Sequence, residues 1–349
     1  PPPLPLPPCS WRSRDYHTTL FATSPQSAYA PAAMLLLPLL LLALPADAFE
    51  SDQLTSRVDP PDDALEAANA YANALLAQAA VRTNRLTRCV QDDARTRDEL
   101  ARQIHRVMGG RDYVPSRGSQ PPMGYGAYAA WLETGPVDRD THEERDDLYA
   151  EVGFGDSAIL ATFGPSSTVR LGPWLLGVDK IDHFWIQGYD YFRRSDAGSE
   201  PARAVDWGTR TELGIWGLLT TGVFSYADLA ANYDGMLFYT GLLAEGSVLL
   251  RDQVGCVVLD RPFDWSAWID WRYDEVLNPS VYKAGMEQAL REGLERRADW
   301  FCENSQVVET RTGAPWVGTQ APQGEDFFQL ADLCKDPEVA ASPKKRGHR

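Results

Sequence analysis

The stretch GVDKIDHFWIQGYDYF, residues 177–192, decides the fold class, because its side chains sort onto two faces at about 100° per residue. One face carries Asp179, His183, Gln187 and Asp190, flanked by Lys180 and Asp182. The opposite face carries Ile181, Phe184, Trp185, Tyr189, Tyr191 and Phe192. This sorting predicts an amphipathic helix over residues 179–193.

The polar face of this helix has two interpretations. In the first, the face lies in water, and Asp179 and Asp182 simply favour the positive end of the helix dipole. In the second, it faces an internal cleft. There Asp179 and His183, four residues apart, hold a metal ion or form a carboxylate-oriented imidazole for proton transfer. The helix alone leaves both interpretations open.

Helical periodicity recurs along most of the chain, so we expect a mainly α protein: a soluble helical bundle with one or two short β-hairpins. Residues 62–108 predict two helices or one long bent helix, and residues 149–177 predict the hairpins. Further helices are expected at 179–193, 211–221, 226–250, 265–276 and 280–303.

The chain divides into five parts by composition. We expect a leader at 1–33, a signal peptide at 34–48, an N-terminal helical region with a Gly/Pro-rich loop at 49–148, a helical core at 149–303 and a loop-rich tail at 304–349. The helical core, residues 149–303, contains the stretch 177–192. Residues 49–62 are polar and contain proline, which is typical of a linker or arm.

The segment MLLLPLLLLALPADAFESD, which begins at Met34, resembles a secretory signal. Its apolar run is too short for the roughly 20 residues that span a bilayer, and Ala46 and Ala48 form a small-x-small cleavage pattern. We expect cleavage before Phe49, which makes residues 1–33 untranslated or disordered upstream sequence. A periplasmic or secreted protein is therefore predicted, not an integral membrane protein after cleavage.

Cysteine usage agrees with export. Beyond the leader the chain keeps Cys89, Cys256, Cys302 and Cys334, an even number without CxxC spacing. Two disulfides are expected in an oxidising compartment, with three connectivities open; four independent buried thiols are the alternative.

Charge and missing motifs exclude several functions. The formal net charge of −16 and the pI near 4.7 disfavour binding to phosphate backbones, so no nucleic-acid partner is expected. The sequence has no GxSxG, no phosphate-binding glycine loop, no HExxH and no dinucleotide fingerprint.

A second polar cluster follows in TRTELGIWGLLTTGVFSYADLAANYDGMLFY, residues 209–239. Glu212 and Asp228 each lie three residues after a hydroxyl residue, so each is placed to close a capping box at a helix start. Capping does not explain Asn232, one turn beyond Asp228, or Gly235, which lowers helix propensity. A close approach of another helix or of a ligand would explain Gly235.

Together these residues resemble the signature of the VanZ-like proteins and related small bacterial envelope proteins of unknown function. The shared order is DKxxH, then a glutamate that opens an apolar helix, then DxxxNxxG, over residues 177–241. The resemblance implies a common site made of Asp179, Lys180, His183, Glu212, Asp228 and Asn232.

Two functions are consistent with such a site. The first is a ligand-binding or structural envelope protein without catalysis, with a polar pocket between helices. There His183, Lys180 and the acids recognise a polar group, for example of an envelope lipid or a cell-wall component, or hold the helices together. The candidate binding residues are Lys180, Glu212, Asn232 and Gly235. The second is a hydrolase-type enzyme. In it, His183 acts as general acid or base oriented by Asp179 or Asp228, or the three bind a divalent magnesium, manganese or zinc ion.

A further candidate is the tryptophan-rich segment WSAWIDWRYDEVLNPSVY, which begins at Trp265. Its acids are Asp270, Asp274 and Glu275. Tryptophans beside carboxylates line carbohydrate sites, but they also pack cores, and the sequence does not choose between these roles.

Overall fold

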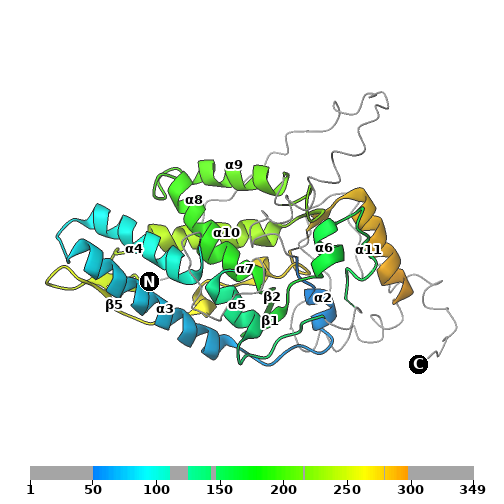
Figure 1. Ribbon diagram of the computed structural model, residues 1–349, viewed down its shortest axis with the longest axis horizontal. Helices are drawn as coiled ribbons and strands as arrows, with labels where there is room; N and C mark the ends of the chain where they lie inside the picture. The colour runs from blue at the N-terminus through cyan, green and yellow to red at the C-terminus, as the bar shows by residue number, and fades with distance from the viewer. Residues whose placement is uncertain (1–49, 111–124, 143–146, 215–216, 279, 298–349) are drawn as a thin grey trace, which may run out of the picture. The chain divides into compact units, whose positions relative to one another are not determined.

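The computed structural model describes residues 50–110, 125–142, 147–214, 217–278 and 280–297. Helices form most of this part of the molecule (Figure 1). The predicted leader, signal peptide and tail, with Cys302 and Cys334, lie outside the described residues. All described residues belong to one unit, 45–349. The mainly α expectation is confirmed.

Helices and short strands follow one another along the chain. The helices are α2 (Gln53–Ser56), α3 (Leu65–Thr87), α4 (Asp93–Met108), α5 (Ala127–Thr134), α6 (Ala158–Phe163), α7 (Asp179–Asp182), the π-helical turn η1 (His183–Gln187), α8 (Gly188–Arg194), α9 (Pro201–Glu212), α10 (Tyr226–Thr240), the 3-10 turns η2 (Trp265–Ala267) and η3 (Trp271–Tyr273), and α11 (Ala284–Arg296). The strands are β1 (Thr168–Leu171), β2 (Trp174–Gly177), β3 (Val223–Phe224), β4 (Leu249–Arg251), β5 (Val257–Leu259) and β6 (Val281–Tyr282). They pair antiparallel as β1–β2, β3–β6 and β4–β5.

The first helical region forms two helices, α3 and α4, which pack against each other. Arg88 has φ 56° and ends α3, and Asp92 starts α4 by accepting a hydrogen bond from the Arg95 backbone N–H. Cys89 lies between the two helices and forms a disulfide with Cys256, just before β5. One of the expected disulfides is therefore present.

Two predicted helices are wrong. Residues 211–221 were expected to form a helix, but α9 ends at Glu212 and the chain then turns through glycines, of which Gly222 has φ 82°. Residues 265–276 form only short 3-10 turns, because the Asp264 and Asp270 side chains accept hydrogen bonds from backbone N–H groups two residues on. The predicted 226–250 helix ends at Thr240, before β4.

The predicted amphipathic helix is present as α7, η1 and α8. Its apolar face packs into an aromatic core, in which the Phe184 ring lies 4.9 Å from that of Trp265, and the Trp185 ring lies 5.1 Å from that of Phe263. The Tyr239 hydroxyl of α10 donates a 2.8 Å hydrogen bond to the Trp185 carbonyl, inside the π-helical turn. This bond satisfies a backbone oxygen in a turn whose spacing departs from the α-helix.

Glycine allows α10 to approach this helix closely, as the sequence suggested for Gly235. A Cβ on Gly235 would lie 2.0 Å from the Phe184 carbonyl oxygen, and a Cβ on Gly188 would lie 2.7 Å from the Gly235 Cα. Side chains at either position would therefore push the helices apart. Among the described residues, no helix combines the length and the apolar character needed to cross a membrane.

Candidate functional site

The polar face of the helix points into the protein, not into water. Asp179, Lys180 and His183 are each 0% exposed, and Gln187 is also buried; only Asp190 is partly exposed. The facing element is α10, whose first two turns carry Asp228 and Asn232. The polar face therefore points inward, as the second interpretation of the sequence expected, and does not lie in water.

Lys180 lies at the centre of the buried groups. Its Nζ is 2.5 Å from Asp179 Oδ2, 2.6 Å from Asp228 Oδ1 and 3.0 Å from Glu275 Oε1. These carboxylates come from α7, from α10 and from the segment after η3. Burial disfavours the charged ammonium, but Asp179, Asp228 and Glu275 outweigh it and raise the pKa of Lys180 well above its usual range.

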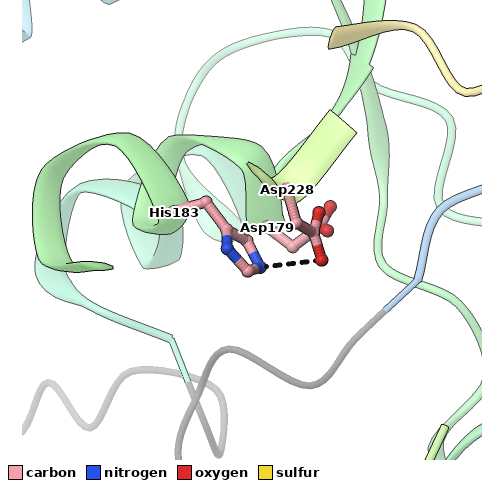
Figure 2. A group of neighbouring side chains, drawn as sticks. All are labelled: Asp179, His183 and Asp228. Carbon is pink, nitrogen blue, oxygen red and sulfur yellow. Dashed lines mark ion pairs between the residues drawn. The ribbon is translucent and has the colours of Figure 1, made fainter. Parts of the chain in front are cut away.

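His183 contacts two side chains of α10, of which Figure 2 shows Asp228. Its Nε2 is 3.1 Å from Asp228 Oδ2, and its Nδ1 is 3.0 Å from Asn232 Oδ1. Burial opposes ionisation of Asp228, but His183 and Lys180 lower its pKa below the usual range. His183 and Lys180 are therefore the two basic partners of the Asp228 carboxylate.

Asn232 extends this chain of contacts, because its Nδ2 donates a 3.1 Å hydrogen bond to Gln187 Oε1. Asp228 is also held from its own backbone, since its N–H donates to Ser225 Oγ, the N-cap of α10. The capping expectation for this residue is thus half right. The hydroxyl caps the helix, whereas the Asp228 carboxylate is directed to Lys180 and His183.

Glu275 is fixed by two hydroxyl groups in addition to Lys180. Ser225 Oγ and Ser280 Oγ donate to its Oε1 at 2.8 and 3.3 Å. Its Oε2 is buried and has no hydrogen-bond partner within the part of the chain that the structure describes. Burial raises the pKa of Glu275, Lys180 opposes this, and Asp228 adds to it.

Two further glutamates border the same groups. Glu212, the last residue of α9, is buried; its burial and the charge of Asp228 raise its pKa well above the usual range. Glu50 is buried as well, and burial together with the charges of Glu275 and Asp228 raises its pKa. We call the seven titratable groups the charge cluster: Glu50, Asp179, Lys180, His183, Glu212, Asp228 and Glu275. Its five carboxyl groups outnumber its two basic groups.

The structure brings together all six residues that the sequence motif singled out. Gly235 serves the helix crossing instead of contacting the cluster. Glu212 was expected to open a helix, which is wrong, because it ends one. Asp182 points elsewhere and accepts a hydrogen bond from the Gly126 N–H at the start of α5.

The two residues that the motif missed are Glu50 and Glu275. Glu275 was flagged within the tryptophan-rich segment, although without a link to Lys180. Its neighbour Asp274 forms a buried ion pair with Arg57, and Asp270 pairs with Arg272. No sequence signal pointed to Glu50, which lies in a segment predicted as a linker or arm.

The group Asp179, His183 and Asp228 has the composition of a divalent-metal site. One ligand atom from each residue lies within 4.8 Å of the others, and all three side chains are buried. Two features compete with a metal ion: Lys180 Nζ already contacts both carboxylates, and His183 Nε2 is already paired with Asp228. Binding would require a neutral His183 with a free ring nitrogen, and Lys180 would have to move.

Comparison with known proteins gives no match. No protein-family model, no curated protein and no solved structure is similar to this chain. The function therefore has to be argued from the site alone.

Proposed function

We propose that this chain is a periplasmic or secreted cell-envelope protein in which the charge cluster has a binding or structural role without catalysis. The leader-like segment beginning at Met34 and the Cys89–Cys256 disulfide support an oxidising compartment outside the cytoplasm. Sequencing the N-terminus of the exported protein tests this part. A start at Phe49 is the expected result, and retention of residues 34–48 in a cytoplasmic protein would refute it.

The observation that carries the structural role is the position of Lys180. One ammonium group contacts carboxylates from three chain segments within 3.0 Å, so it acts as an internal cation that holds α7, α10 and the segment after η3 together. Removing one partner from such a buried pair leaves an uncompensated charge, which costs about 3–5 kcal/mol. The cluster therefore couples the packing of these segments to their charges.

A double-mutant cycle on His183 and Asp228 tests the role of the cluster. The changes His183→Ala and Asp228→Asn, separately and together, should show a coupling in the free energy of unfolding above about 1 kcal/mol. The matched control is the exposed pair Arg203 and Glu200, 2.8 Å apart, for which coupling should stay below about 0.5 kcal/mol. Equal, small couplings for both pairs would contradict the structural role.

A second candidate function, favoured by the 4.8 Å grouping of Asp179, His183 and Asp228, is a hydrolase-type enzyme. His183 would act as general acid or base with a carboxylate, or the three residues would bind a divalent ion. Elemental analysis of native protein and of His183→Ala decides the metal form. Stoichiometric metal that is lost in the variant would favour the metal form of this candidate, and native protein without metal would exclude that form.

The VanZ-like resemblance and an envelope lipid or cell-wall component as partner belong to this proposal. What supports them is that Asp179, Lys180, His183, Glu212, Asp228 and Asn232, in the order of that signature, border one buried cluster. Co-sedimentation of the protein with anionic lipid vesicles, and separately with purified peptidoglycan, tests the partner. The protein should pellet with one of these, and recovery in both supernatants would rule out both partners.

A further inference from the structure

The N-terminal arm, residues 50–57, is inserted into the interior instead of forming a linker. Every side chain in it except Thr55 is buried. Its backbone is bonded to the segment just before β1, because the Ser166 N–H donates a 2.7 Å hydrogen bond to the Glu50 carbonyl. The arm also contains α2. It therefore belongs to the folded unit and delivers Glu50 to the charge cluster.

Gly177, at the end of β2, makes room for this arrangement. A Cβ at this position would lie 2.1 Å from Ser51 Oγ and 2.1 Å from Asp179 Oδ1. The arm and the cluster thus meet at the same point of the backbone. Ser166, whose N–H donates to the Glu50 carbonyl, also donates a 3.0 Å hydrogen bond from its Oγ to Asp179 Oδ1, so the arm lies beside the cluster.

The arm is held almost entirely by polar contacts. Ser56 Oγ donates to Asp140 Oδ2 at 2.8 Å, Asp52 accepts from the Leu148 N–H, and Arg57 Nη2 forms a buried ion pair with Asp274 Oδ2 at 2.5 Å. Leu54 is the one large apolar side chain that it buries. Because burial of apolar area is the main term that stabilises a fold, a segment held in this way detaches more easily than the helices.

We propose that the N-terminal arm is a strap that opens as a unit and so admits ligands to the charge cluster. This inference rests on the proposed binding role of the cluster. Asp179, Lys180 and His183 are fully buried when the strap is closed, so a ligand reaches them only after some segment moves. The arm has little apolar anchoring, and it meets the cluster at Gly177, where Ser51 and Asp179 lie side by side.

Lys180 reports the opening of the strap. The whole chain has five lysines, and Lys283 is exposed, which makes it an internal standard in the same molecule. Reductive dimethylation with formaldehyde and cyanoborohydride, read by peptide mass, gives the modification rate of each lysine. In parallel, amide hydrogen exchange compares the arm with α10 in the full-length protein.

If the strap opens, arm amides exchange at least about 100-fold faster than α10 amides, and urea below the unfolding transition hardly changes their rates, as in local opening. Lys180 then becomes modified at a rate that follows the arm amides. The change Ser56→Ala, which removes the bond to Asp140, should accelerate Lys180 modification about tenfold. Ser266→Ala, which removes an exposed hydroxyl–carboxylate bond to Asp264, is the matched control and should have no effect.

Two outcomes overturn the strap. In one, Lys180 modification rises with urea in parallel with α10 exchange, so only global unfolding exposes it. In the other, Lys180 is modified by local opening, but the arm stays protected and Ser56→Ala changes nothing, so another segment opens. Failure of the proposed binding role is distinct, because it would show as recovery of the protein in both co-sedimentation supernatants, whatever the arm does.

Discussion

Replacing Lys180 with methionine tests the charge cluster most directly. The variant keeps the length and apolar stem of the side chain but removes the ammonium group. Three carboxylate oxygens, now 2.5, 2.6 and 3.0 Å from Nζ, lose their shared cation. Since each belongs to a buried group, none is compensated by water.

The expected loss in free energy of unfolding at pH 7 is about 3–5 kcal/mol, the cost of breaking a buried ion pair from one side. The loss is not three times as large for the three carboxylate partners, because proton uptake by one carboxyl group relieves the repulsion among the others. In the variant, the pKa values of Asp228 and Glu275 rise in the folded state. That state then holds more protons than the unfolded chain, so the loss shrinks as the pH falls toward 5.

Urea unfolding followed by tryptophan fluorescence measures this effect at both pH values. Lys283→Met, at an exposed position, is the control and should stay within about 0.5 kcal/mol of the native protein. A Lys180→Met variant as stable as the native protein at pH 7 would refute the reasoning that the ammonium holds the cluster. An equal loss at pH 5 and pH 7 would refute the charge-based explanation of it.

Three further predictions concern other parts of the fold. Gly235→Ala should lose about 1–3 kcal/mol by overpacking the helix crossing, measured by urea unfolding, whereas Gly155→Ala, with open space around it, should be neutral; equal effects would contradict the close approach. Replacing Cys89 and Cys256 with serine should cost about 2–4 kcal/mol, and an unchanged thermal midpoint would argue against the disulfide. Burial and Asp270 raise the pKa of Asp234 to about 6 against the opposing effect of Arg272, so the unfolded chain releases this proton first as the pH rises. Stability should therefore fall between about pH 4 and 6, and Asp234→Asn should flatten that slope; an unaltered pH profile would refute the shift.

Much of the secondary structure was predictable because helices leave a local signature. The apolar spacing in residues 177–192 specified a helix and its buried aromatic face, and the Gly235 crossing followed from a glycine with no local purpose. The predictions failed where short-range hydrogen bonds compete with the helix. Asp264 and Asp270 turn the tryptophan-rich segment into 3-10 turns, and the glycines after Glu212 end α9 where an apolar helix was expected.

The composition of the cluster was only partly predictable. Spacing placed Asp179 and His183 one turn apart on the same helix face, and the resemblance implied a common site with Asp228. Periodicity cannot tell whether a polar face meets water or another polar face. Glu275 and Glu50 lie 95 residues after and 130 residues before Lys180 in the sequence, and no local pattern links them to it.

The sequence by itself determined most of the helices and their apolar faces, and it singled out six of the residues that meet at the site. The tertiary structure decided that this site is buried, that Lys180 neutralises three carboxylates at its centre, and that a polar N-terminal arm supplies Glu50. The physical reason is that helix formation depends on neighbours within about four residues, whereas burial and charge pairing depend on which distant segments the packing brings together.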